Sequence, residues 1–384
     1  MSIKRFLCLF FSIALLFSAV LAEEAEGTRL LALNVGKADC LLLMSGGFTY
    51  LIDTGYEHTF NTLLDALRRY QVDHLDGVFL THCDKDHAGG LSLLAESDIG
   101  VSAWYASDCY YDLPFNGHPM IAAAALRNAS VTWLSAGDVL NDGFNTFTLL
   151  GPLSVSTENE NNNSMVFLFE SPDGSILFTG DMKAEEENEL LRAGVFSQVD
   201  IVKVPFHGDN SASSRPFTEA VHAALAIIST STSEEADTPS SAVIKRYGLM
   251  DTPCVVTQEY DFGVLVTLLN GQLASEAVQR ELAAYKLRAS IDLENDTLKL
   301  LNFNSEPVSL SGWLLYSSEG ETTIVLPKEA VIPANGVLRI GTRMTGSGAD
   351  IYLDCKRLWH KSKRDTAVLY DLSGAVAVTV GNGL

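Results

Sequence analysis

The sequence predicts a mixed α/β domain followed by a smaller all-β domain. From residue 30 to about residue 270, short apolar runs alternate with segments of helical spacing, which is typical of α/β architecture. From residue 290 onward the pattern changes to short strands with frequent turns. A length of 384 residues and an apolar content of 47% favour two domains over one and supply enough apolar surface for a sizeable core.

Short apolar segments bounded by turn residues mark the expected strands of the first domain. They cover residues 30–34, 40–44, 48–52, 75–80, 131–134, 144–150, 165–170, 175–178, 201–204, 225–229, 254–258 and 263–269. Helices are expected at residues 61–70, 90–95, 120–128, 185–193 and 217–223. Residues 229–241 are rich in Ser, Thr and Glu and are expected to form a surface loop.

A linker and a second domain follow. Residues 276–287 are expected to form a linking helix. The expected strands of the second domain cover residues 298–303, 308–315, 322–326, 336–340, 366–371 and 375–380, with turns between them. This spacing predicts a small β-sandwich. The predicted organisation is a first domain at 28–272, a linker at 273–289 and a sandwich domain at 290–384.

The N-terminus has the three regions of a secretory signal peptide at residues 1–22. Lys4 and Arg5 precede an apolar run, and residues 20–22 form a cleavage-type triplet before Glu23. We expect cleavage there, a secreted or cell-surface protein and no stable membrane span in the mature chain. A retained N-terminal anchor helix is the alternative. The formal charge of −22 gives the chain no general attraction to a phosphate backbone.

The most informative stretch is residues 81–90, Thr-His-Cys-Asp-Lys-Asp-His-Ala-Gly-Gly, directly after the apolar run at 75–80. A strand that delivers two imidazoles and two carboxylates to its C-terminal end aims several ligating atoms at one point. The pattern predicts a divalent-metal site, and its two carboxylates favour harder ions such as Mn²⁺ or Mg²⁺. A polar loop after a buried strand is the alternative.

Three further segments lie next to expected strands and could complete this site. Asp181 follows the strand at 175–178 and could bridge two ions, or it could cap the next helix. His207 follows the strand at 201–204, where an ordinary loop histidine is the alternative. The Asn-rich residues 159–164 could carry a ligand, orient water or form a simple turn. The sequence contains no serine nucleophile elbow, P-loop or dinucleotide fingerprint, so metal-assisted chemistry is favoured.

Residues 30 to about 270 resemble the metallo-β-lactamase fold, specifically the corresponding domain of the DNA-internalisation competence protein ComEC. The motifs that carry the resemblance occur in the matching order, at residues 34–39, 51–55, 81–90, 161–164, 178–181 and 203–208. The resemblance implies an αββα sandwich with a mono- or dinuclear site at one edge. It also implies hydrolysis of phosphodiesters, lactams, lactones or thioesters. In this branch an Asp replaces the second His of the motif, as Asp84 does here, and a nuclease role is attributed to the branch.

The resemblance also assigns roles to individual residues. The implied metal ligands are His82, Asp84, Asp86, His87, Asp181 and His207. His82 and Asp84 would hold one divalent ion and Asp86 and His87 a second, with Asp181 between the two ions. Mn²⁺ or Zn²⁺ is expected, with Mg²⁺ as a further candidate. Asp86 and His87 are the implied catalytic residues, with Asp86 as the base that orients the attacking water when the second ion position is empty, and Asp53 would support the site. The branch usually has a second His where this chain has Phe206, and Ser where it has Asp209.

Residues from about 288 to 384 resemble the lamin-tail domain, an immunoglobulin-like sandwich. The match lies in residues 298–304, 308–313, 332–336 and 365–374. In secreted bacterial proteins such domains are appended to nucleases and phosphoesterases, which implies a binding or anchoring module. The second domain has one basic cluster. It could contact nucleic acid, an anionic polymer of a different kind or a cell surface, and the alternative is a solvated loop. It consists of Lys356, Arg357, Lys361, Lys363 and Arg364.

The sequence therefore predicts a secreted, metal-dependent hydrolase, in particular a nuclease or phosphodiesterase that acts on DNA or another phosphodiester. A hydrolase of lactams or lactones is the alternative within the same fold. A non-catalytic surface-binding protein with a structural metal is the alternative from a different class.

Overall fold

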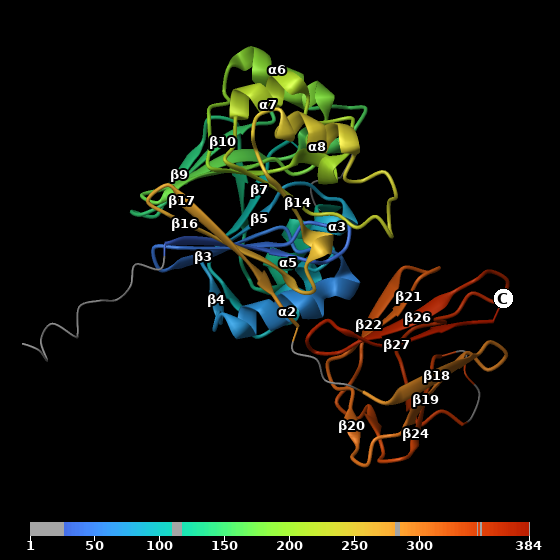
Figure 1. Cartoon of the computed structure of the whole chain (residues 1–384). Coiled ribbons are helices and arrows are strands. Elements are labelled where there is room, and N and C mark those ends of the chain that lie inside the picture. The colour runs from blue at the N-terminus through green and yellow to red at the C-terminus, as the bar shows by residue number, and fades with distance from the viewer. Residues whose placement is uncertain (1–26, 110–116, 281–284, 344, 346–347, 384) are drawn as a thin grey trace, which may run out of the picture.

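The computed structural model describes residues 27–109, 117–280, 285–343, 345 and 348–383. The predicted signal peptide lies outside these residues. Two β-sheets pack face to face in the first part of the chain, and helices cover the outer face of each sheet (Figure 1). This four-layer arrangement confirms the predicted α/β architecture. Within the described ranges, no helix combines the length and apolar character that a bilayer span requires.

Eight strands form the first sheet, in the order β17-β16-β1-β2-β3-β5-β7-β8. They are β1 (Thr28–Leu33), β2 (Leu41–Ser45), β3 (Phe48–Ile52), β5 (Gly77–Leu80), β7 (Trp104–Ser107), β8 (Val131–Leu134), β16 (Gly263–Leu269) and β17 (Gln272–Val278). A separate ribbon pairs β4 (His74–Leu75) with β6 (Gly100–Val101). The helices on the outer face are α2 (Phe60–Arg69), α4 (Leu91–Glu96) and α5 (Pro119–Leu126). Their apolar residues share one buried core with the sheet.

Seven strands form the second sheet, in the order β15-β14-β13-β12-β11-β10-β9. They are β9 (Val139–Asn141), β10 (Thr146–Gly151), β11 (Val166–Ser171), β12 (Gly174–Phe178), β13 (Ile201–Lys203), β14 (Leu225–Ile228) and β15 (Cys254–Val256). Its outer helices are α6 (Ala184–Ala193), α7 (Arg215–Val221) and α8 (Ser241–Gly248). Between the sheets, the Phe79 ring stacks on Phe147 and Phe167 at centroid distances of 4.9 and 5.1 Å.

The parallel strands position the candidate site. Strands β3, β5, β7 and β8 run parallel in the first sheet, and β12 to β15 run parallel in the second. The loop after β5 meets the segment before β11 at one edge, where the amide of Met165 donates to the carbonyl of Thr81 at 2.8 Å. The loops after β12 and β13 meet there as well, since the amide of Phe206 donates to the carbonyl of Gly180 at 3.3 Å. Loops at the carboxyl ends of parallel strands are the usual location of binding sites in α/β folds.

The described residues of the C-terminal part are mainly in β-strands, as predicted. One sheet contains β18 (Leu287–Asp292), β19 (Thr297–Asn302), β24 (Val337–Gly341) and β25 (Ile351–Tyr352). A second contains β22 (Thr322–Val325), β21 (Leu314–Ser317), β26 (Thr366–Tyr370) and β27 (Val376–Gly381), and β20 (Val308–Ser309) pairs with β23 (Val331–Ile332). Side chains from these sheets share one core around Trp313 and Trp359. The immunoglobulin-like assignment stays a prediction.

The linking helix predicted at 276–287 is wrong in the described residues. Residues 272–278 form β17, which pairs with β16 along its whole length, and β18 begins at Leu287. The expected strand at 308–315 is two short strands, because the chain turns at Gly312 with φ of 77°. Glycine adopts such a positive φ at little cost, whereas other residues do not.

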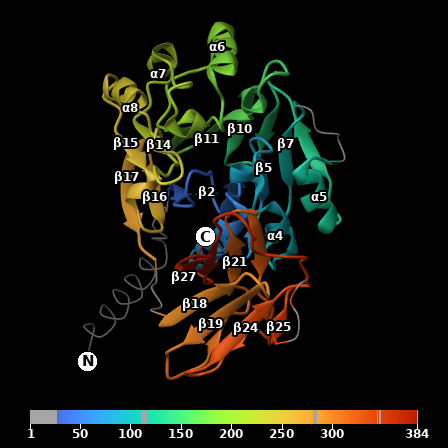
Figure 2. The same ribbon diagram turned by 90° about the vertical axis from the view of Figure 1, so that its right-hand side faces the viewer.

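The C-terminal strands pack against the first part (Figure 2), and hydrogen bonds join them to α2. Asn61, which is 2% exposed, donates from Nδ2 to the backbone carbonyls of Gly312 and Asp371 at 3.2 and 2.8 Å. Arg280 Nη1 donates to the carbonyl of Ser373 at 2.8 Å. Buried polar groups that lose such bonds cost about 1–3 kcal/mol each, so these bonds hold the two parts in a defined arrangement.

Glu186 on α6 is a buried carboxylate without a hydrogen-bond partner among the described residues. Burial, with a smaller contribution from Glu189, raises the pKa of Glu186 well above the ordinary value of 4.5. The folded protein therefore holds a proton that the unfolded chain releases, so stability falls as the pH rises above 4.5.

We expect Glu186→Gln to raise the free energy of unfolding at pH 8 by about 1–3 kcal/mol, because glutamine resembles the protonated carboxyl but needs no proton. Near pH 4 the parent and the variant should be equally stable. Urea unfolding at both pH values measures the difference. A gain of the same size at both pH values would contradict the ionisation argument.

Candidate metal centre

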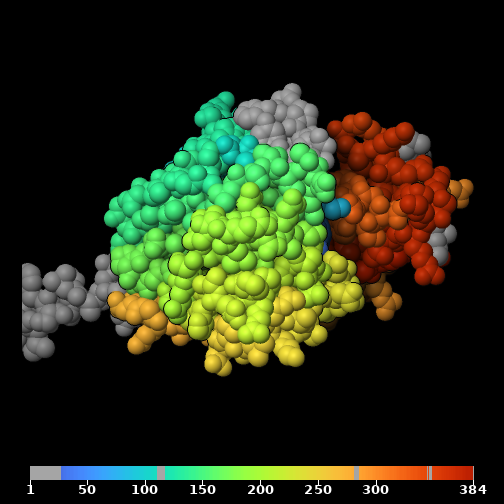
Figure 3. Space-filling view, turned by 90° about the horizontal axis from the view of Figure 1, so that it is seen from above, coloured from blue at the N-terminus to red at the C-terminus, as the bar shows by residue number. Residues whose placement is uncertain are grey.

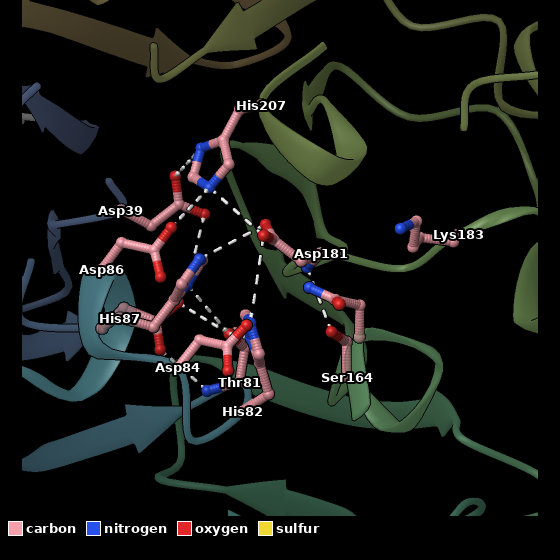
Figure 4. A network of polar contacts seen from close by, with 12 residues as sticks. Asp39, Thr81, His82, Asp84, Asp86, His87, Ser164, Asp181, Lys183 and His207 are labelled. Atoms are coloured by element: carbon pink, nitrogen blue, oxygen red, sulfur yellow. Dashed lines mark hydrogen bonds and ion pairs between the residues drawn. The ribbon is translucent and has the colours of Figure 1, made fainter. Parts of the chain in front are cut away.

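The predicted motif begins where the buried strand β5 ends. The chain turns after His82 into the short helix α3 (Lys85–Ala88), which carries Asp86 and His87. The imidazole of His82 lies with its Nε2 atom 3.6 Å from Asp84 and 3.9 Å from Asp181 (Figure 4). Asp84 is half-exposed, whereas His82 and His87 are buried.

Asp181 lies at the centre of the cluster and is 1% exposed. Its Oδ1 atom is 3.3 Å from His87 Nε2, and its Oδ2 atom is 3.2 Å from His207 Nε2. The hydroxyl of Ser164 accepts a hydrogen bond from the Asp181 amide at 3.0 Å and fixes this turn after β12. The alternative role of Asp181 as a helix cap does not apply, because Lys183 occupies the N-cap position of α6.

His207 comes from the turn η4 (Pro205–Gly208) after β13. Phe206 and His207 both adopt positive φ angles, 46° and 52°, which non-glycine residues rarely do. The Nδ1 atom of His207 donates to the carbonyl of Ser229 at 2.8 Å, because a carbonyl can only accept. In the neutral ring the Nε2 atom then carries the lone pair, and it faces Asp181 and, at 3.4 Å, Asp86.

Asp53 orients a second imidazole. Its Oδ2 atom accepts hydrogen bonds from His87 Nδ1 at 2.8 Å and from the Thr81 hydroxyl at 2.7 Å, and its Oδ1 atom accepts one from the Thr81 amide at 2.8 Å. The Thr81 hydroxyl lies 3.2 Å from His82 Nδ1. Carboxylate–histidine pairs of this kind turn the remaining ring nitrogen toward a metal and raise its basicity. This geometry fits the supporting role expected for Asp53.

The polar atoms that face the centre fit a metal ion. The Nε2 atoms of His82, His87 and His207 and the Oδ1 atom of Asp181 are buried and have no hydrogen-bond partner among the described residues. Buried polar atoms are normally paired, so four convergent unpaired atoms indicate ligands that share an ion. The ligating atoms of Asp86, His87, Asp181 and His207 all lie within 4.8 Å of one another. Imidazole and carboxylate together suit divalent ions.

The imidazoles and carboxylates of the cluster shift one another's pKa values toward the charged forms. Burial lowers the pKa of His207, but the carboxylates of Asp181 and Asp86 reverse this and raise it to about 9. Burial raises the pKa of Asp86, but His207 and His87 hold it at about 2. The interaction with the His82 imidazole, 3.6 Å away, lowers the pKa of Asp84. The carboxylates are therefore ionised at neutral pH, and an ion that binds must displace protons from the imidazoles.

Of the six residues expected to hold metal, four form one compact group, His82 lies 3.9 Å from Asp181, and Asp84 lies 3.6 Å from His82. The Asn-rich segment does not reach them: Asn163 pairs with the backbone of Ser156, and Asn162 with Glu185. Only Ser164 of that segment contacts Asp181. Phe206, which stands where the branch has a second His, has its ring 4.1 Å from Lys183 Nζ and 5.5 Å from Lys37 Nζ.

Two residues beneath the site carried no expected role. Lys203, 1% exposed, places its Nζ atom 2.5 Å from the buried carboxylate of Asp39. Asp39 in turn lies 3.9 Å from His87 Nδ1 and 3.8 Å from His207 Nδ1. The signal was present in the sequence as a lysine at the end of an otherwise apolar strand, which requires a buried counter-ion.

We expect Lys203→Met to lower the free energy of unfolding by about 3–5 kcal/mol, because it leaves the Asp39 carboxylate buried without its cation. Lys245→Met, an exposed lysine on α8, is the matched control and should change stability little. Thermal and urea unfolding of the metal-free proteins give the comparison. Equal stability of the two variants would show that Asp39 does not depend on Lys203.

Comparison with known proteins gives a consistent result. Residues 33–231, just over half of the chain, match the Metallo-beta-lactamase superfamily. ComE operon protein 3 of Bacillus subtilis is 25% identical over 221 residues, which cover 56% of this chain and 27% of that protein. Recombination protein 2 of Haemophilus influenzae is 27% identical over 245 residues, which cover 62% of this chain and 29% of that protein.

The match therefore spans less than a third of the length of these two curated relatives. Among solved structures, the metallo-beta-lactamase fold protein YhfI from Bacillus subtilis aligns with a TM-score of 0.40 and 13% identity, over 65% of this chain and 100% of that chain. The matched region contains every residue of the cluster from Asp39 to His207. The chain belongs to the metallo-beta-lactamase superfamily.

Proposed function

We propose that the protein is a secreted, metal-dependent phosphodiesterase that acts as a nuclease. The observation that carries this proposal is the convergence of three buried imidazole nitrogens and the Oδ1 atom of Asp181, none of them hydrogen-bonded among the described residues. His82, Asp84 and Asp181 would hold one ion, and Asp86, His87 and His207 would join Asp181 around a second. A divalent ion held there would supply a Lewis acid that lowers the pKa of water and takes up negative charge on phosphate oxygens.

The protein's own groups have defined tasks in this proposal. Asp86 is ionised at neutral pH and its side chain is 14% exposed, so its carboxylate can accept the proton of the attacking water when the second ion position is empty. Asp53 and the Ser229 carbonyl hold His87 and His207 in the tautomers that leave Nε2 free. The ammonium groups of Lys37 and Lys183, both near the Phe206 ring, can attract an anionic substrate.

A phosphodiester is favoured over a lactam or lactone for two reasons. Asp84 makes the first ion position richer in oxygen, which favours harder ions such as Mn²⁺ and Mg²⁺. These are the ions that commonly neutralise phosphate groups. The name of Recombination protein 2 adds support for a nucleic-acid substrate. A lactam or lactone hydrolase and a binding protein with a structural metal are the alternatives.

The C-terminal strands would serve as a lamin-tail-like binding module. The basic cluster predicted there lies on the segment from Lys356 to Arg364, where its lysines are exposed. Lys363 pairs with Glu319, so part of the charge is already compensated. A contact with an anionic polymer or cell surface is consistent with the remaining basic side chains and with export of the chain.

We expect Mn²⁺ to support more hydrolysis than Zn²⁺ after the protein has been stripped with a chelator, because of the oxygen-rich ligand set. The measurement is a screen of the metal-free protein, reloaded with Mn²⁺, Mg²⁺ or Zn²⁺, against DNA, RNA, a phosphodiester reporter and a lactam. Cleavage of the lactam without cleavage of DNA, RNA or the reporter would refute the proposed function and show a lactam hydrolase instead. Activity with Zn²⁺ alone would refute the expected metal preference.

A further inference from the structure

A cavity of about 550 Å³ lies between the first domain and the C-terminal strands. On one side it is lined by Lys85 and Gly89, which belong to the metal motif. On the other side it is lined by Tyr316 and Thr323 of the second C-terminal sheet. The C-terminal part forms a lobe beside the first domain (Figure 3), so the cavity has walls from both.

The cavity lies within the electrostatic field of the metal cluster. Burial and the negative charge of Asp86, followed by that of Glu234, raise the pKa of Tyr56, another lining residue. Lys85, which separates Asp84 from Asp86 in the sequence, forms an ion pair with Glu321 across the cavity. The cavity therefore adjoins the metal motif, which contributes Lys85 and Gly89 to its lining.

The C-terminal wall is fixed against the first domain. Besides the buried bonds of Asn61, Gly374 approaches Thr62 so closely that a side chain on this glycine would lie 2.0 Å from the threonine hydroxyl. Tyr56, His58 and Tyr316 form a column of stacked rings across the boundary, with His58 centroid distances of 5.1 and 4.3 Å to the two tyrosines. The wall is therefore a built part of the site.

The column gives the cavity an aromatic lining, and its middle ring is uncharged. Burial lowers the pKa of His58 to about 4, so the imidazole is neutral at physiological pH. Aromatic lining of this kind suits a planar heterocycle.

The charged groups of the lining are mostly acidic. Glu57, Glu234 and Glu321 line the cavity, and its one lysine, Lys85, is already paired with Glu321. This acidic lining repels a further phosphate group. It offers carboxylate oxygens to N–H donors of the kind that nucleobases carry.

We propose that this cavity binds a single terminal nucleoside next to the scissile phosphate, a proposal that rests on the phosphodiesterase function. The protein then cleaves dinucleotides and strand ends in preference to internal positions of a polynucleotide. An internal position would carry a second phosphate along the acidic lining, whereas a terminal nucleoside carries none. The volume of the cavity lies within the range of about 300–1,000 Å³ that is typical of small-molecule sites.

The test compares three substrates with the Mn²⁺-loaded full chain. They are two deoxyadenosines joined by one phosphodiester, methyl 4-nitrophenyl phosphate, and circular single-stranded DNA. Thr323→Trp fills the cavity from its C-terminal wall and should lower kcat/KM for the dinucleotide by about tenfold or more. Hydrolysis of methyl 4-nitrophenyl phosphate should stay within about twofold, because that substrate has no nucleoside to place. Val331→Trp, an exposed position on β23, is the matched control and should change neither.

A charge inversion supplies a second, milder variant. Glu321 is an exposed side chain, so Glu321→Lys should fold normally and should make the rim of the cavity basic. We expect it to increase cleavage of circular DNA relative to the dinucleotide by about tenfold, since the repulsion of the second phosphate is removed. Glu329→Lys makes the same charge change at an exposed position outside the cavity and should have no such effect.

The outcomes separate the two proposals. If the parent hydrolyses none of the three substrates, the phosphodiesterase function is wrong, and the cavity is not a substrate site. If the parent hydrolyses them but neither cavity variant changes the ratio of dinucleotide to circular DNA, the function stands and the nucleoside assignment is wrong. Equal cleavage of circular DNA and the dinucleotide per phosphodiester by the parent would also overturn the assignment.

Discussion

Asp86→Ala is expected to lower kcat for phosphodiester hydrolysis by about 10²–10⁴-fold, the usual contribution of a general base. His207 and His87 hold the Asp86 carboxylate ionised. Of the four residues whose ligating atoms lie within 4.8 Å of one another, Asp86 is the one with a partly exposed side chain, at 14%. The variant should keep one bound ion, because His82, Asp84 and Asp181 do not depend on Asp86. Steady-state kinetics and metal analysis of the same sample measure both effects.

Asp98→Ala is the matched control, since it removes an exposed carboxylate after α4 and should change neither kcat nor metal content. Hydrolysis by the Asp86 variant at the parent rate would show that this carboxylate is not the base. A complete loss of metal would show that Asp86 is needed to hold both ions, and the kinetic result could then not be assigned to proton transfer.

Asp181→Ala is expected to remove bound metal almost completely and to abolish hydrolysis with it. Among the described residues, Asp181 is the one carboxylate within 4 Å of all three imidazoles, at 3.9, 3.3 and 3.2 Å from His82, His87 and His207. Its loss takes a ligand from both ion positions and leaves partly protonated imidazoles without their main counter-charge. Elemental analysis after dialysis against Mn²⁺ gives the metal content of the parent and of both aspartate variants.

The contrast between the two variants is the informative result. The Asp86 variant should retain metal and lose activity, whereas the Asp181 variant should lose both. If the Asp181 variant binds as much metal as the parent, the ions do not lie between these imidazoles. Circular dichroism checks that the fold of the Asp181 variant is intact, because a buried ligand can also support folding.

Much of the first domain could be predicted because its strands are buried on both faces. A continuous apolar run such as β5, whose residues are all buried, is visible in the sequence without knowledge of its neighbours. Helix α8 (Ser241–Gly248) was not predicted, since it follows a Ser- and Thr-rich loop and has only two fully buried residues, Val243 and Tyr247. Strand β7 was also missed, and it has only four residues.

The predicted helix at 276–287 is wrong because tertiary contacts decide the structure of this segment. Glu276 and Ala277 favour helices by intrinsic propensity, yet they pair with Leu265 and Val264 of β16 at the edge of the first sheet. The free backbone groups of the neighbouring strand β16 favour a strand at this position, and the local sequence pattern does not show that β16 lies there.

The site was predictable where ligands follow strands in recognisable motifs, and not where partners come from distant segments. His82 to His87 form a dense local pattern, and Asp181 and His207 each follow an apolar strand. The pairing of Lys203 with Asp39 depends on two segments that meet only in the folded chain. The cavity wall supplied by Tyr316 and Thr323 depends on how the C-terminal strands pack, which no spacing in the sequence shows.

The central claim is that bound metal at the His82–His207 cluster produces phosphodiester hydrolysis. The most direct measurement is a titration of the metal-free full chain with Mn²⁺, in which bound ion and hydrolysis of a phosphodiester reporter are followed in the same sample. Hydrolysis is predicted to rise in proportion to the ion bound and to be absent in the Asp181→Ala variant at the same Mn²⁺ concentration. Metal binding that saturates without any phosphodiester hydrolysis would contradict the claim and favour a structural metal.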